Sequence, residues 1–259
     1  MSSSIHVTLG EVAASLVLVG VAAAVSFWRK ADLEKDIGIA VVRSAIQLIA
    51  IGYVINAIFD SDSLALTFGL IAVMVVFGAL QARQRAKKVP NAFWPLLIAL
   101  GIAGGATLGL VVGLGIFEAK PRFLVPVGGM VVGNSMTAAA VALNRLGDEI
   151  TDRGREIEAT LALGATARQA ASGLVTRSLR SGMIPLIDST KTTGIVFFPG
   201  TLVGSLLAGA DPTDAVRLQL ILLWTLMGSV ALSSVLAVSL GYRGFFTPAH
   251  QLREIPAES

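Results

Sequence analysis

The stretch FWPLLIALGIAGGATLGLVVGLGIF, residues 93–117, contains no charged side chain. An α-helix needs about 20 consecutive apolar residues to cross the hydrocarbon core of a bilayer. This run is long enough and apolar enough to do so, and it therefore predicts a transmembrane helix.

Further apolar runs of similar length lie on both sides of this one. Segments in lipid are helical because a helix satisfies its own backbone hydrogen bonds. The sequence therefore predicts an all-α, polytopic membrane protein with about seven transmembrane helices, in a single domain over residues 1–259. The predicted spans are 8–28, 37–59, 64–82, 93–117, 123–145, 185–208 and 215–240.

The composition agrees with a chain that is solvated by lipid. Of the 259 residues, 54% are hydrophobic and 14% are charged, and the mean hydropathy is +0.76; a soluble domain has roughly 25% charged residues. The isoelectric point near 9.5 suggests nucleic-acid binding at first sight. The charges lie, however, in short clusters between apolar runs, which is typical of membrane proteins. We therefore expect lipid and no nucleic acid as a partner.

The distribution of basic residues predicts the orientation. Cytoplasmic loops of membrane proteins carry an excess of Lys and Arg. Most of the 20 Lys and Arg follow the first, third, fifth and seventh predicted spans, whereas Lys120, Arg122 and Arg217 lie in the opposite set of loops. We expect the N-terminus outside and the C-terminus in the cytoplasm, in an inner or plasma membrane. Residues 1–10 contain no Lys or Arg, so no cleavable signal is predicted.

Glycines recur every four residues in the fourth predicted span, on one helix face. Small residues at this interval let helix backbones approach closely in lipid. Helix packing is therefore the favoured interpretation, and a pore-lining role is the alternative. The residues of this stripe are Gly101, Gly105, Gly109 and Gly113.

Residues 148–182 form the one sizeable segment between predicted spans that has no transmembrane-length apolar run. Its centre, residues 156–170, is rich in Ala, Leu, Glu, Arg and Gln, which are strong helix formers. Gly164 would end a first short helix, and a second helix would begin near Ala167 and lead into the sixth span. The sequence predicts a stiff elbow on the cytoplasmic face.

This elbow has the features of a docking surface. Small side chains such as Ala159 would let a partner come close, while Glu158 and Arg168 would fix its register. The alternative is an amphipathic helix that lies flat on anionic lipid.

Several polar side chains lie at bilayer depth. Ionisable groups there cost on the order of 2.5–3.5 kcal/mol on insertion scales, so they are usually retained for a reason. One interpretation is structural, with Asp188 paired to Lys191 and Arg43 bonded to a carbonyl or to an asparagine. The other is that they line the route of a substrate. The set comprises Arg43, Gln47, Asn134, Ser135, Asp188 and Lys191.

Two prolines sharpen the second interpretation. Pro185 and Pro199 bracket the sixth span, and each removes a backbone donor. Interrupted helices at membrane depth line water or pack within protein. Oxygen atoms of the asparagine, serine and aspartate in the polar set would suit a hard cation, whereas its arginine and lysine would suit phosphate or carboxylate. The residues alone leave both substrates open.

Five motifs occur in order along the chain. They are RSAIQL (43–48), GNSMTA with ALNR (133–138 and 142–145), EATLALGAT (158–166), KTTG with PG (191–194 and 199–200) and LAGADP (207–212). In residues and spacing the chain resembles the FetB family of ABC permeases, bacterial iron exporters whose plant relatives are aluminium-tolerance permeases. Residues 158–164 also resemble the Glu-Ala-Ala-x-x-x-Gly loop that docks ABC importer permeases on their ATPase.

The resemblance implies a non-enzymatic permease subunit of an ABC exporter that moves iron out of the cytoplasm, or a nucleotide sugar as proposed for the plant relatives. It implies that Glu158, Ala159, Gly164 and Arg168 couple the chain to an ATPase. The sequence has no Gly-x-x-x-x-Gly-Lys-Ser/Thr loop, so ATP and Mg²⁺ would bind a separate cytoplasmic subunit and this chain would hold no cofactor. A second copy is expected, because about seven spans are few for a transporter and C2 closure is the default.

The chain departs from the expected family pattern at one place. We expect methionines after residue 200 in relatives, but Thr201 and Leu202 stand here, which removes soft metal ligands. Two other functions stay open. An ion-gradient-driven transporter would use Asp188 as its coupling group, although no internal repeat is evident. An intramembrane enzyme would need a nucleophile and base, for which Ser135 or Ser189 with Lys191 is the available choice.

Overall fold

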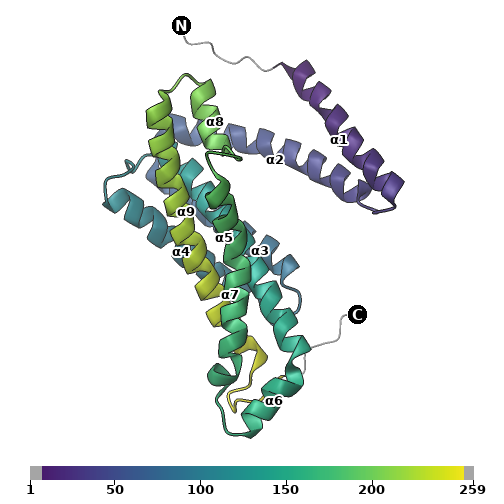
Figure 1. Ribbon diagram of the computed structural model, residues 1–259. Coiled ribbons are helices and arrows are strands. Elements are labelled where there is room, and N and C mark those ends of the chain that lie inside the picture. The colour runs from purple at the N-terminus through teal and green to yellow at the C-terminus, as the bar shows by residue number, and fades with distance from the viewer. Residues whose placement is uncertain (1–7, 254–259) are drawn as a thin grey trace.

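The computed structural model describes residues 8–253. Nine α-helices with short connections make up this part of the chain (Figure 1). Their order and bounds are α1 Leu9–Arg29, α2 Glu34–Ser61, α3 Leu64–Arg85, α4 Phe93–Gly113, α5 Pro121–Asp152, α6 Gly154–Ala162, α7 Ala167–Thr192, α8 Gly200–Leu207 and α9 Pro212–Gly241, followed by the 3₁₀-helix η1 Tyr242–Phe245.

Six of the helices in residues 8–253 are long and apolar enough to cross a membrane, namely α1, α2, α3, α4, α5 and α9. Their positions agree with the corresponding predicted spans, and the chain is a polytopic all-α membrane protein. The helix α5 is longer than predicted, since it continues to Asp152 instead of ending near residue 145.

The sixth predicted span, residues 185–208, is wrong as a single helix. The helix α7 starts at the elbow, passes through Pro185 and ends at Thr192. The chain then leaves the helix over residues 193–199, where Gly194 adopts a φ of +89° and its N–H donates to the Phe197 carbonyl at 2.8 Å. Pro199 precedes the eight-residue helix α8. The break therefore lies in residues 193–199, whereas Pro185 is accommodated inside α7.

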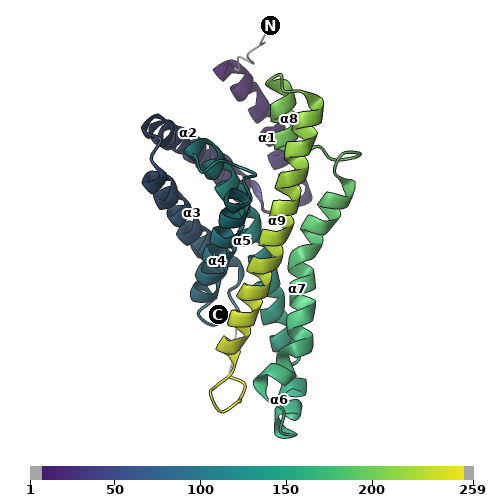
Figure 2. The same cartoon turned by 90° about the vertical axis from the view of Figure 1, so that its left-hand side faces the viewer.

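The helix α5 forms the centre of the bundle, because it contacts α3, α4, α7 and α9. Figures 1 and 2 show these helices running roughly side by side, with α6 at one end. Leucines of α4 and α5 are completely buried in the main apolar core. These are Leu96, Leu100, Leu143 and Leu146.

The glycine stripe of α4 is largely open. A Cβ atom added at Gly105, Gly109 or Gly113 would meet nothing within 4 Å, and these glycines border an apolar cavity of about 640 Å³ beside α3. The helix-packing interpretation is therefore wrong for most of the stripe within one chain. Close packing occurs elsewhere: a Cβ at Gly182 of α7 would lie 2.7 Å from the Ala138 carbonyl of α5.

The helices α1 and α2 form an arm that lies mostly outside the bundle (Figure 1). None of the most apolar stretch of α2 is buried, and only 6% of that of α1 is. Large apolar side chains such as Leu18 and Tyr53 are about three-quarters exposed, at 74% and 75%. The arm therefore presents its surface to lipid or to another chain.

Candidate functional site

The elbow has the geometry that the sequence predicts: a short helix, a bend and a second helix. Gly164 adopts a φ of +91°, which is the left-handed region that glycine enters without strain. Thr166 then begins α7 with a capping box, in which its N–H donates to the Gln169 side chain at 2.8 Å. The left-handed glycine and the capping box together fix where the chain turns.

One side of the elbow is exposed and the other is anchored. Ile157 and Ala167 are buried, at 3% and 7% exposure, and belong to the main apolar core. At the tip, Leu163 is 89% exposed. The four predicted coupling residues are all exposed, and the elbow lies at the end of the bundle (Figures 1 and 2). They are Glu158, Ala159, Gly164 and Arg168.

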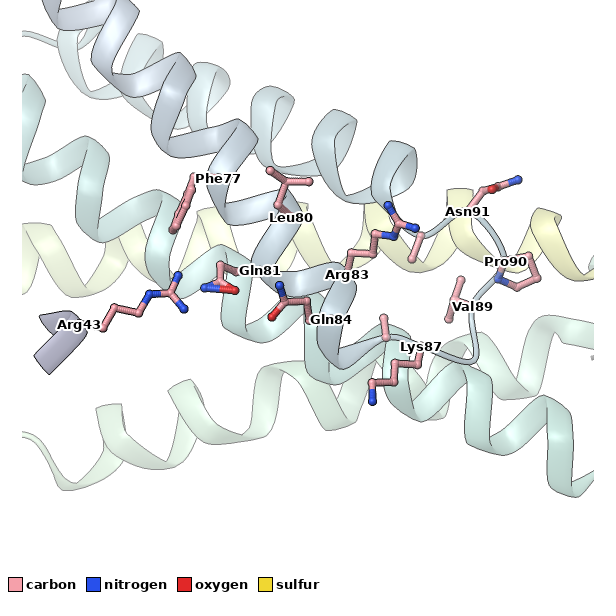
Figure 3. Close-up of a pocket in the computed structure, with 12 residues that line it drawn as sticks. Arg43, Phe77, Leu80, Gln81, Arg83, Gln84, Lys87, Val89, Pro90 and Asn91 are labelled. Carbon is pink, nitrogen blue, oxygen red and sulfur yellow. The ribbon is translucent and has the colours of Figure 1, made fainter. Parts of the chain in front are cut away.

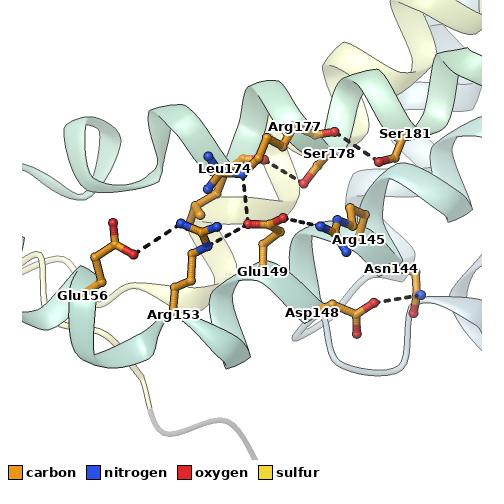
Figure 4. A network of polar contacts seen from close by, with 10 residues as sticks. All are labelled: Asn144, Arg145, Asp148, Glu149, Arg153, Glu156, Leu174, Arg177, Ser178 and Ser181. Atoms are coloured by element: carbon orange, nitrogen blue, oxygen red, sulfur yellow. Dashed lines mark hydrogen bonds and ion pairs between the residues drawn. The ribbon is translucent and has the colours of Figure 1, made fainter.

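A cluster of three arginines around one carboxylate holds the base of the elbow (Figure 4). Glu149 of α5, only 4% exposed, accepts from Arg145 at 2.5 Å, from Arg153 at 3.1 Å and from Arg177 of α7 at 3.0 Å. Arg153 stands directly before α6, and its side chain also reaches Glu156 at 3.4 Å. A buried charge requires such partners. This Glu149 cluster therefore ties α5, α6 and α7 together.

Sequence reasoning missed the Glu149 cluster. The signal was present, because Arg145, Glu149 and Arg153 are spaced four residues apart, which places them on one helix face. The partner from α7, Arg177, is far away in sequence, and only the fold brings it to within 3.0 Å of Glu149.

Two further contacts brace the same end of the molecule. Lys88, in the loop between α3 and α4, pairs with Asp148 of α5 at 2.9 Å. The N–H of Ala167 donates to Nδ1 of His250 at 3.4 Å, so the chain after α9 returns to the start of α7. The elbow is thus supported by segments from several parts of the sequence.

The polar pair of α2 lies on one face, as its spacing predicts. Arg43 and Gln47 border one groove on this helix. The guanidinium of Arg43 lies 5.7 Å from the centre of the Phe77 ring on α3, which is within cation–π range. The expected bond of Arg43 to a backbone carbonyl or to Asn134 is not formed within residues 8–253, and Asn134 donates to the Met130 carbonyl of its own helix at 2.9 Å.

The polar residues of α5 point in different directions. Asn134 is exposed, whereas Ser135 is 1% exposed and its hydroxyl bonds that of Ser229 on α9 at 2.8 Å. Ser135 therefore joins two helices. Thr201, at the expected methionine position, donates to Gln219 of α9 at 2.5 Å.

The polar pair of α7 forms an ion pair. Nζ of Lys191 lies 3.2 Å from Asp188, and both side chains are more than 60% exposed, at 69% and 62%. The predicted pairing of Asp188 with Lys191 is thus confirmed. The hydroxyl of Ser189 donates to the Leu186 carbonyl, so the serine–lysine contact that an enzyme would need is not formed.

The six predicted route residues thus lie on α2, α5 and α7, two on each helix, and within residues 8–253 no hydrogen bond or ion pair joins the residues of one helix to those of another. Within residues 8–253, no group of three or more His, Asp or Glu side chains is placed to hold a metal ion.

Comparison with known proteins identifies the family. The family described as "Uncharacterised protein family (UPF0014)" matches residues 9–246. The chain belongs to this family. Its resemblance to the FetB permeases, seen in the motifs, is confirmed by overall similarity. No solved structure shows a significant match.

Three relatives of this UPF0014 chain come from two bacteria and a plant. It is 37% identical over 250 residues to the probable iron export permease protein FetB of Escherichia coli, covering 96% of each chain. It is 39% identical over 225 residues to the membrane protein YjkA of Bacillus subtilis, covering 87% of this chain and 90% of the relative. It is 35% identical over 241 residues to the protein ALUMINUM SENSITIVE 3 of Arabidopsis thaliana, covering 93% and 88%.

Proposed function

We propose that this chain is the permease subunit of an ABC-type exporter that moves iron out of the cytoplasm across the inner membrane. A separate ATPase subunit would supply the energy and would bind ATP and Mg²⁺. The name of the Escherichia coli relative, a probable iron export permease, supports the substrate and its direction. The observation that carries the proposal is the exposed, anchored elbow between α6 and α7.

The elbow suits the transmission of force. Its outer face carries Glu158 and Arg168, which offer charges of both signs to a partner, and Leu163 offers an apolar contact. Its inner face is held by Ile157 and by the Glu149 cluster. Because α6 cannot move far without disturbing α5 and α7, a push from the ATPase would reach the helix bundle.

The arm supports the expected second copy. Arg43 and Gln47 lie on α2, and the most apolar stretch of this helix has no buried residue. Gln47 is exposed, and a polar side chain that faces lipid finds no hydrogen-bond partner there. A partner copy that covers this face of the arm would supply one, and a two-fold symmetric pair is the commonest way to close such an interface.

The substrate route in this proposal runs between the two copies. Exposed polar groups would shape it, among them Gln47, Asn134, Asp188 and Lys191, while Ser135 would hold α5 against α9. ATP-driven closure of the ATPase pair would then rock the bundles between inward-open and outward-open arrangements.

Reconstitution tests the proposal. The chain is purified with the ATPase that co-purifies from its native membrane and is placed in liposomes, where ATP-dependent movement of ferrous and ferric iron is compared with that of nucleotide sugars. Arg168→Glu should abolish the coupling of ATP hydrolysis to transport. Arg217→Glu, near the start of α9 and far from the elbow, should leave this coupling intact. Full transport by the chain alone without ATP would refute the proposal, and transport that follows pH or sodium would indicate a gradient-driven carrier.

A further inference from the structure

A second polar feature lies away from the elbow tip, where the arm meets α3. A cavity of about 740 Å³ opens between α2, the last turns of α3 and the loop before α4. Figure 3 shows the residues that line it. Its polar lining residues are Arg43, Gln81, Arg83, Gln84, Lys87 and Asn91.

The charged side chains that line this cavity are all positive. Three cations line it, and no carboxylate occurs among its lining residues. Within residues 8–253, Arg43, Arg83 and Lys87 make no ion pair, although other basic residues of the chain do. Like charges around a common space repel one another, and a bound anion relieves that repulsion.

The side chains are arranged to hold an anion with several oxygens. In Figure 3 the guanidinium of Arg43 points toward the amide of Gln81, and the amide of Gln84 lies beside it. Neither amide has a hydrogen-bond partner in the described part of the chain. Guanidinium groups match phosphate oxygens with paired donors, and the amide N–H groups supply further donors. Arg83 extends toward Asn91, at the loop side of the cavity.

The wall of the cavity is well packed. Ala86, Val89 and Ala92 are 1%, 4% and 2% exposed, and the loop that carries them is tied to α5 by the ion pair between Lys88 and Asp148. On the side away from the loop, Phe77 and Leu80 add apolar surface. The cavity thus joins a basic loop end to an apolar helix face.

We propose that this cavity binds a phosphate-bearing anion. A membrane phospholipid could supply the phosphate, because basic pockets between transmembrane helices on the cytoplasmic side bind anionic headgroups, and the apolar side would take the acyl chains. A soluble phosphate compound is the other source of the same chemistry. The proposal is independent of the proposed function, since it concerns binding without ATPase or transport.

Thermal stability of the delipidated protein in neutral detergent tests the proposal. The ligands are phosphatidylglycerol, phosphatidylcholine and inorganic diphosphate, compared at equal ionic strength, and each variant is compared with its own ligand-free midpoint. We expect phosphatidylglycerol or diphosphate to raise the melting temperature. In Arg83→Gln and in Lys87→Gln the concentration for half of that effect should rise by about fivefold, as for one lost charged contact. Arg85→Gln changes the same charge on the same helix outside the cavity, and it should behave as the wild type.

Each outcome decides between the alternatives. A shift with phosphatidylglycerol and not with diphosphate identifies a lipid headgroup, and the reverse identifies a soluble phosphate. The proposal is overturned if neither ligand raises the melting temperature, if phosphatidylcholine acts equally well, or if Arg85→Gln weakens the effect as much as Arg83→Gln. Mass spectrometry of retained lipid gives a second readout for a variant whose stability is altered.

Discussion

Replacement of Glu149 by glutamine should loosen the attachment of the elbow. The amide keeps the shape of the side chain but removes the charge that Arg145, Arg153 and Arg177 share. Breaking a buried ion pair costs about 3–5 kcal/mol. The three arginines are 43–49% exposed, so water screens part of this interaction, and we expect a loss of about 2–3 kcal/mol. At about 2–4 °C per kcal/mol, the melting temperature should fall by about 4–12 °C.

Glu156→Gln is the matched control. Glu156 contacts the same Arg153 at 3.4 Å, but it is 70% exposed. Its replacement should change stability by at most about 0.5 kcal/mol. Both variants are measured in the same detergent by tryptophan fluorescence, since the chain has three tryptophans. In the presence of the ATPase, Glu149→Gln should also lower transport per ATP hydrolysed.

The refuting result is clear. If Glu149→Gln and Glu156→Gln lower the melting temperature equally, the Glu149 cluster does not hold α5 against α7. A double replacement with Arg177→Gln adds a further test. Because the two residues share one contact at 3.0 Å, their effects should be less than additive.

Three other variants probe different parts of the chain. Gly164→Pro should leave the protein in the membrane but uncouple ATP hydrolysis from transport, because a φ of +91° is closed to proline; normal coupling in a liposome assay would contradict this. Gly182→Ala should destabilise the bundle by about 1–3 kcal/mol, since its Cβ would lie 2.7 Å from the Ala138 carbonyl, whereas Gly109→Ala should be tolerated in the same melting assay. Lys191→Met should reduce flux more than abundance, and the opposite ratio on immunoblots and in flux assays would make its ion pair structural.

The sequence predicted the membrane-spanning helices well where they are uniformly apolar. The charge-free run of residues 93–117 left little choice, and Gly164 marked the bend of the elbow because few residues adopt its conformation. The sequence did not place the end of α7, because a proline can either stand inside a continuing helix or mark a helix boundary. Pro185 is accommodated inside the helix, while Pro199 follows a non-helical segment.

The candidate site was less predictable because it depends on which helix faces meet. Asn134 and Ser135 are adjacent, yet one is exposed and the other is buried against Ser229. The spacing of Asp188 and Lys191 did predict their ion pair, since three residues bring side chains together on one helix. Contacts between distant helices, such as Glu149 with Arg177, leave no periodic signal in the sequence.

The continuity of α5 has a mechanical consequence. Its 32 residues make a rod of about 48 Å, longer than the hydrocarbon core of about 30 Å. Asn134 lies near the middle, about 22 Å from Glu149 and about 20 Å from Pro121. A rigid helix that rotates about a point near its midpoint behaves as a lever with two arms of almost equal length. A displacement at the Glu149 end would reappear at the Pro121 end with similar size and opposite sense, so that narrowing one mouth of the bundle would widen the other.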